Sequence, residues 1–281
     1  KVMESYSKAL KKIGISYLGN ITQSVKMRLS FNDKDNPTMT YNIYLAPATL
    51  ARDENHPHLN VCPFSKNCAK SCLNGSGHNK CDILARGIEH SKTNRSRIKK
   101  THLFYDDREL FMSILLHELE RYRMKADQMD MDFAVRLNCT SDLSPELFVF
   151  NGMNILELYP NVMFYDYTKE PKRLVTKKKY DNYDVTFSFD GENWDICEKY
   201  LKEGGKVAVV FDCHSGKEQI LPKFYKGYKV IDGNNNDMRY LNEGGTIIGL
   251  HYHRVANNYK NGKYEEIETP FIVKRNSDCI F

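Results

Sequence analysis

The stretch Phe133-Ala134-Val135-Arg136-Leu137-Asn138 opens a repeating pattern that decides the fold class. Five further short runs of apolar, β-branched or aromatic residues follow it, at Val162–Tyr167, Tyr183–Phe189, Lys206–Phe211, Tyr228–Ile231 and Thr246–Leu250. Successive runs start 29, 21, 23, 22 and 18 residues apart, and the pieces between them are helix-sized and contain proline or glycine. This alternation is typical of βα units that build a parallel sheet.

Two earlier segments add candidate strands. Residues 40–47 alternate between apolar and polar and end at Pro47, and Val25–Phe31 is a second candidate. With them the chain has up to eight strands. We therefore expect an α/β fold, an irregular (β/α) barrel-like arrangement with a cysteine-rich metal-binding insertion. The alternative is an open doubly wound sheet.

The length fits one large domain. At 281 residues the chain can bury a core without covalent help. We expect residues 1–281 to form a single α/β domain, with residues 60–101 as a cysteine-rich basic insertion within it. The most secure helix follows Asp106, where apolar residues from Leu110 to Tyr122 recur at helical spacing.

Half of the chain's eight cysteines lie close together, at Cys62, Cys68, Cys72 and Cys81. Four such thiolates can hold one zinc ion or an iron–sulfur cluster. The gaps of five, three and eight residues match no standard zinc or ferredoxin spacing. Zinc is the leading prediction and an iron–sulfur cluster the alternative, and His78 is a candidate to replace one cysteine. The alternative to a metal site is a disulfide pair or four free thiols in a surface loop.

The same region is basic. Residues 61–101 contain nine lysines and arginines against two acids. Cationic side chains bind nucleic-acid phosphates and release counterions, whereas a solvated helix face is the alternative reading. The candidates for nucleic-acid binding are Arg95, Arg97, Lys99 and Lys100.

No segment approaches the roughly 20 apolar residues that cross a bilayer, and the first residues lack the apolar core of a signal peptide. A cytoplasmic location without a membrane partner is the expectation.

Polar side chains follow nearly every predicted strand. Aspartates stand at or just after the strand ends, at Asp142, Asp166, Asp190, Asp212, Asp232 and Asp237. One such aspartate commonly caps a helix. The repetition instead indicates a site at the carboxyl ends of the strands, where carboxylates act as nucleophile, general base, purine acceptor or magnesium ligand.

These residues carry a resemblance to the phage family called gene product 88. It covers most of residues 40–250 and includes the stretches 41–48, 62–74, 97–108, 136–142, 164–169 and 230–233. The resemblance implies family cysteines at Cys62, Cys68 and Cys72, and a cysteine at Cys81 in only some members, so three thiolates keep the iron–sulfur alternative open.

A second likeness, in type only, is to the tRNA-guanine transglycosylases and their phage DNA-directed relatives. Those enzymes are (β/α) barrels with a cysteine-rich zinc insertion of different spacing, a basic surface and aspartates at strand ends. The likeness implies a pentosyltransferase that exchanges guanine in DNA, or in RNA, for a 7-deazaguanine, a small purine-like base.

For that reaction we expect Asp142 or Asp166 as the nucleophile. The residues expected to bind the substrate are Arg136, which would orient a carboxylate, and Asn138, Asp232 and Asp237, which would read the purine edge. The alternatives are a metal-dependent nuclease or other phosphoryl-transfer enzyme and a non-enzymatic, cysteine-cluster nucleic-acid-binding protein.

Overall fold

The structure of the protein, a computed structural model, describes residues 2–21, 24–213 and 220–281. The chain divides into two compact units. The first comprises residues 1–63 and 86–164, and the second comprises residues 64–85 and 165–281. The division cuts the predicted insertion at residues 60–101, so Cys62 belongs to the first unit and Cys68, Cys72 and Cys81 belong to the second.

The first unit holds the strand order β1-β2-β3-β6. The bounds are β1 Gly19–Asn20, β2 Thr38–Ile43, β3 Asp132–Arg136 and β6 Met163–Thr168, the last of which begins in this unit. β1 pairs antiparallel with β2, whereas β2, β3 and β6 are parallel. The register sets Asn42 opposite Arg136 at the carboxyl ends of β2 and β3.

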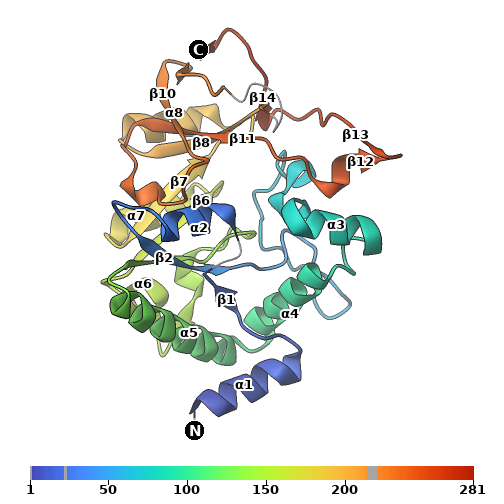
Figure 1. Ribbon diagram of the computed structural model, residues 1–281, viewed down its shortest axis with the longest axis vertical. Coiled ribbons are helices and arrows are strands. Elements are labelled where there is room, and N and C mark those ends of the chain that lie inside the picture. Colours follow the sequence, from blue (N-terminus) through green and yellow to red (C-terminus); the bar gives the residue numbers. More distant parts are fainter. Residues whose placement is uncertain (1, 22–23, 214–219) are drawn as a thin grey trace. The chain divides into compact units, whose positions relative to one another are not determined.

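Among the residues that the structure describes, five helices belong to the first unit. They are α1 Val2–Ile13, α2 Val25–Phe31, α4 Lys92–Asp106, α5 Arg108–Gln128 and α6 Ile155–Leu158. Of these, α2 packs on β2 and α5 packs on β2 and β3. α5, the long green helix of Figure 1, contacts α4, β2 and β3. Asp107, one residue later than expected, caps it by accepting a hydrogen bond from the Leu110 backbone N–H.

The expected strand at residues 25–31 is wrong, because these residues form helix α2. Ser24 caps the helix by accepting a hydrogen bond from the Met27 backbone N–H. Met27 and Ser30 are its buried residues, and their spacing of three places both on one helical face. The Ser30 hydroxyl donates to the Lys26 carbonyl, four residues back.

The second unit holds the order β6-β7-β8-β11-β10-β9-β15, with β14 also beside β8. The bounds are β7 Tyr183–Ser188, β8 Lys206–Phe211, β9 Phe224–Tyr225, β10 Tyr228–Asp232, β11 Thr246–His251, β14 Ile272–Val273 and β15 Cys279–Ile280. β7, β8, β11, β10 and β14 pair in parallel, whereas β9 pairs antiparallel with β10 and β15.

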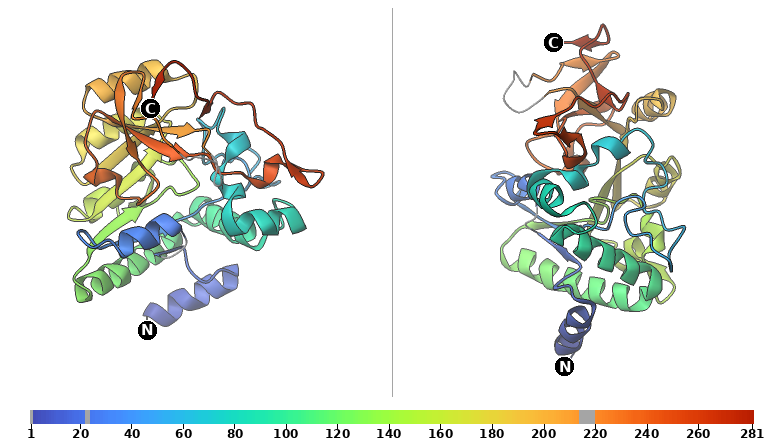
Figure 2. Two further views of the ribbon diagram at one scale, coloured as in Figure 1. Left: turned by 45° about the horizontal axis from the view of Figure 1, so that its top comes forward. Right: turned by 90° about the vertical axis from the view of Figure 1, so that its right-hand side faces the viewer.

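Two helices cover these strands. α7 Lys172–Lys179 packs against β7, and α8 Trp194–Lys202 packs against β7 and β8 (Figure 2). Cys197, Tyr200 and Leu201 of α8 are buried in the apolar core of the unit, as the spacing of apolar residues predicts. Buried apolar area of this kind contributes about 25 cal/mol per Å² to stability.

The remaining elements are short. They are α3 Gly77–Arg86, the 3₁₀ turns Ala69–Ser71, Leu73–Gly75, Pro145–Leu147, Arg239–Leu241 and Ala256–Asn258, and the hairpins β4 Val149–Phe150 with β5 Met153–Asn154 and β12 Tyr259–Lys260 with β13 Lys263–Tyr264. No helix in the described part of the chain is both long and apolar enough to span a membrane.

The βα rhythm is thus confirmed as a mixed α/β fold with eleven mostly parallel strands. Along β2, β3, β6, β7, β8 and β11 the parallel strands keep their sequence order, as in a (β/α) barrel, whereas β10 and β14 depart from it. The strand order is open, and no pairing among the described residues closes a barrel.

One buried carboxylate organises the first unit. Glu118 of α5 is 4% exposed and accepts hydrogen bonds from the backbone N–H groups of Leu18 and Gly19, each at 3.0 Å, and from the Tyr41 hydroxyl of β2. Burial, and then the Glu118 charge, raise the pKa of the Tyr41 hydroxyl well above its ordinary value. One acid therefore ties β1 and β2 to α5.

We expect Glu118→Leu to lower the free energy of unfolding by about 3 kcal/mol, because it leaves buried donors without an acceptor. Glu118→Gln keeps an acceptor oxygen and should cost less. Glu120→Gln is the control on the same helix: its side chain is 46% exposed, and its ion pair with Arg123 contributes at most about 1 kcal/mol. Urea unfolding measures all three, and equal losses for Glu118→Leu and Glu120→Gln would contradict this role.

Candidate active site at the carboxyl ends of the strands

In the first unit the segment after β3 is tied to the segment after β2. The Cys139 backbone N–H donates to the Ile43 carbonyl at 3.1 Å, and the Thr140 hydroxyl donates to the Leu45 carbonyl at 2.6 Å. The Asp142 N–H then donates to the Val61 carbonyl at 2.8 Å. Three successive bonds therefore hold the loop that carries Asp142.

Asn138 holds the same loop from inside. Its side-chain N–H donates to the Leu143 carbonyl, and its side-chain oxygen accepts from the Ser141 hydroxyl and the Leu143 N–H, all at 2.8 Å. The residue is 2% exposed. These bonds engage both ends of the amide, which argues against the predicted role in reading a purine edge and makes Asn138 a residue that positions the loop.

Asp142 is half-buried at this edge. The 3₁₀ turn that follows has Ser144 as its N-cap, so Asp142 lies two residues before the cap position. Arg136, also half-buried, ends β3. Near Asp142, the Cys62 thiol lies 3.7 Å from the Thr140 carbonyl. The first predicted cysteine ligand and the first predicted nucleophile therefore belong to one loop junction.

The basic run lies on α4. Arg95 and Lys99 are exposed, and Arg97 is half-buried with its guanidinium 4.9 Å from the ring centre of Tyr44, the first residue after β2. Lys100 departs from the expectation, because it is 4% exposed and its ammonium lies 4.7 Å from the Tyr17 ring centre. Only Arg95, Arg97 and Lys99 therefore have exposed surface for phosphates.

In the second unit Asp166 belongs to a buried ion pair. Its carboxylate lies 2.6 Å from the Arg173 guanidinium of α7, with side chains 2% and 0% exposed. The Tyr183 hydroxyl of β7 contacts both groups. The Asp166 carboxylate is therefore buried and paired with a cation, whereas Asp142 is half-buried.

Two other predicted residues lie at the end of β10 and after it. Asp232 is exposed, and its carboxylate accepts a hydrogen bond from the Asn234 backbone N–H at 2.8 Å, which forms a tight turn. Asp237 is 1% exposed and accepts from the Tyr165 hydroxyl of β6 at 3.0 Å. Of this pair, only Asp232 is exposed to a ligand.

The four predicted cysteine ligands are divided between the units, with Cys62 in the first and Cys68, Cys72 and Cys81 in the second. Cys68 and Cys72 flank the turn Ala69–Ser71, and Cys81 is exposed on α3. The Asn67 carbonyl, beside Cys68, accepts a hydrogen bond from the Thr269 hydroxyl at 2.9 Å, which ties this segment to the region before β14. A zinc ion or iron–sulfur cluster at Cys62, Cys68, Cys72 and Cys81 stays a prediction.

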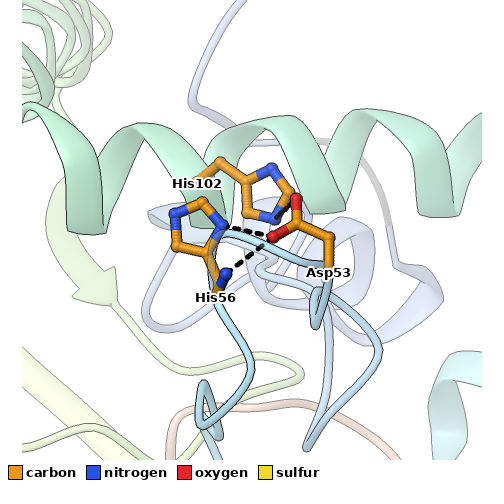
Figure 3. Close-up of side chains that lie close together, drawn as sticks. All are labelled: Asp53, His56 and His102. Atoms are coloured by element: carbon orange, nitrogen blue, oxygen red, sulfur yellow. Dashed lines mark hydrogen bonds and ion pairs between the residues drawn. The ribbon is translucent and has the colours of Figure 1, made fainter.

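The described residues contain one group of at least three potential metal ligands whose donor atoms all lie within 4.8 Å, namely Asp53, His56 and His102 (Figure 3). His102 projects from α4, and Asp53 and His56 come from the loop after β2. The sequence reading missed this group. The available signal was the spacing of His102 and Asp106, four residues apart and hence on one helical face.

Fold and strand-end loops define the class of the protein: a mixed α/β protein with an open, mostly parallel sheet and polar loops at the strand carboxyl ends. Within that class the chain belongs to the phage gene product 88 family, whose family profile matches residues 17–267. No curated protein and no solved structure matches the chain. The likeness to transglycosylases therefore gains no support from these comparisons.

Lys100 gives a pH test of the site region. Burial is the main cause that lowers its pKa, to about 8, whereas an unfolded lysine keeps a pKa of about 10.4. Between these values the unfolded state binds more protons, so stability rises with pH. We expect the wild type to gain about 3 kcal/mol over this range relative to Lys100→Met.

Chemical denaturation at pH 7 to 10.5 measures this difference. Lys99→Met is the matched control, because Lys99 is the exposed neighbour, and it should keep the wild-type pH dependence. Identical slopes for Lys100→Met and the wild type would contradict a desolvated ammonium.

Proposed function

We propose that the protein is a nucleic-acid-modifying enzyme that exchanges a base, a pentosyltransferase acting on DNA, with Asp142 as the nucleophile. One observation carries the proposal. Two features follow adjacent parallel strands at the same edge of the sheet. The loop after β3 carries the half-buried Asp142 carboxylate and is held by three hydrogen bonds, and Tyr44 follows β2 with the Arg97 guanidinium over its ring. The incoming base is a 7-deazaguanine, as the likeness in type suggests.

The reaction has two displacements. The Asp142 carboxylate attacks C1′ of the target nucleotide, the glycosidic C–N bond breaks, and guanine leaves with the bonding electron pair and takes up a proton. The incoming base then attacks C1′ through its ring nitrogen, which loses a proton, and the carboxylate is released. Because both displacements occur at C1′, the phosphodiester backbone stays intact.

The target base has to leave the stack before a carboxylate can reach its sugar. Tyr44 with Arg97 offers an aromatic and cationic surface on which a base can stack, an interaction of about 1–3 kcal/mol. Arg95 and Lys99 on the same helix add exposed positive charge for the backbone phosphates. Arg136, which ends β3 at the same edge, remains a candidate for a contact to the exchanged base.

A second candidate is metal-dependent phosphoryl transfer on nucleic acid. It is favoured by the Asp53, His56 and His102 group, whose His102 lies on the same helix as the basic residues. Strand cleavage that needs a divalent metal, without release of guanine, separates this candidate from base exchange. Binding without either reaction would indicate a non-enzymatic nucleic-acid-binding protein.

Asp142→Asn tests the nucleophile. In an assay that counts labelled guanine or 7-deazaguanine in DNA, the variant should lose about three orders of magnitude or more in exchange rate. Its stability should stay within about 1 kcal/mol of the wild type, since the loop is held by backbone and Asn138 bonds. Asp132→Asn, at the opposite end of the same strand, is the control. An Asp142→Asn protein with full exchange would refute the assignment.

The basic helix yields a separate prediction for binding. Neutralising Arg95 and Lys99 to glutamine should weaken binding to unrelated DNA sequences alike, and each lost phosphate contact should reduce the salt slope by about 0.9 for a duplex. Lys34→Gln is the control, because Lys34 is exposed in the loop at the opposite, amino end of β2. Fluorescence anisotropy over a salt series measures both, and unchanged slopes would show that α4 does not meet phosphates.

A further inference from the structure

We propose that Asp53, His56 and His102 form a binding site for a divalent transition-metal ion, with zinc as the best fit, and that Asp106 positions His56 from behind. The proposal rests on side-chain geometry and stands independently of the base-exchange reaction and of the four cysteines.

The donor atoms face one another. His56 Nδ1 lies 2.7 Å from one carboxylate oxygen of Asp53, and His102 Nε2 lies 3.6 Å from the other. The two imidazole rings stack with centres 4.4 Å apart and an angle of 13° between their planes (Figure 3). Ligand atoms of a tetrahedral zinc are separated by about 3.3 Å, which is close to the separations seen here, and the stacked rings have to turn about their Cβ–Cγ bonds for both lone pairs to point at one ion.

Asp106 supplies the outer contact that metal-bound histidines commonly have. Its carboxylate lies 2.7 Å from His56 Nε2, the ring nitrogen that faces away from Asp53. A carboxylate on the far nitrogen fixes the ring orientation and makes the near nitrogen a stronger ligand. His56 is thus held as a ligand would be, with Nδ1 directed at Asp53.

The loop that carries Asp53 and His56 is arranged in advance. The Val61 N–H donates to the Ala48 carbonyl at 3.0 Å and closes the loop at its base. The loop docks on α4 through the His102 ring, whose Nε2 donates to the Ala51 carbonyl at 2.7 Å. A metal ion at Nε2 would replace that proton, and the Ala51 carbonyl oxygen beside it could serve as a further ligand atom.

The donor set selects the class of ion. Two imidazoles and one carboxylate suit zinc and related transition metals, whereas magnesium and calcium prefer oxygen ligands alone. The imidazoles are 16% and 24% exposed, while the Asp53 side chain is 41% exposed. Because the group is open to solvent on the Asp53 side, water can complete the coordination sphere.

Zinc titration of the chelator-treated full chain tests the site by calorimetry. We expect His102→Ala to remove one equivalent of bound zinc, and His90→Ala, at an exposed histidine outside the group, to bind like the wild type. Asp106→Asn should weaken binding by about 10- to 100-fold. Cys68→Ser should leave this equivalent in place, which separates it from any cysteine-bound metal.

Asp53→Asn guards against unfolding as the cause of a loss. The Asp53 carboxylate accepts backbone hydrogen bonds from Asn55 and His56, and an asparagine oxygen can accept both. We expect this variant to keep the wild-type circular dichroism and melting temperature while binding at least about tenfold more weakly. Unchanged zinc stoichiometry and affinity in the folded His102→Ala and Asp53→Asn proteins would overturn the proposal.

Discussion

The candidate active site depends on the hydrogen bonds that tie the segment after β3 to the segments after β2. Parallel strands are joined by long crossovers rather than tight turns, so nothing local fixes how their carboxyl ends lie. Here Cys139, Thr140 and Asp142 bond to Ile43, Leu45 and Val61 in turn. The side chains at this edge are thereby held before any ligand arrives, which is what a displacement at a single carbon atom requires.

Much of the fold could be predicted from the sequence because apolar runs report strands directly. The run Lys206–Phe211 coincides with β8, and the other five predicted runs differ from their strands by a few residues at the ends. The strand predicted at Val25–Phe31 was wrong because a short apolar run fits both the helical and the strand periodicity. The residues form a helix that Ser24 caps. Whether the sheet closes into a barrel could not be predicted from the sequence, because closure depends on pairing between strands that are far apart in the chain.

The sequence predicted those features of the candidate site that lie within a single segment of the chain. The position of Asp142 after a strand was visible in the sequence, as was the basic character of α4. The partner of Asp166 was not visible in the sequence. Arg173 lies on the helix after the strand, in a lysine-rich segment that is typical of an exposed surface. The Asp53, His56 and His102 group joins a loop to a helix about 50 residues later, a proximity that no local pattern encodes.

The central claim, that Asp142 attacks the sugar of a nucleotide, can be tested at the atom concerned. The protein is incubated with single-stranded DNA without an incoming base, quenched by denaturation, digested and analysed by peptide mass spectrometry. The account predicts a deoxyribose-linked DNA adduct on the peptide that contains Asp142, and its absence in the Asp142→Asn protein. An adduct on another residue, or cleaved DNA with no adduct, would contradict it.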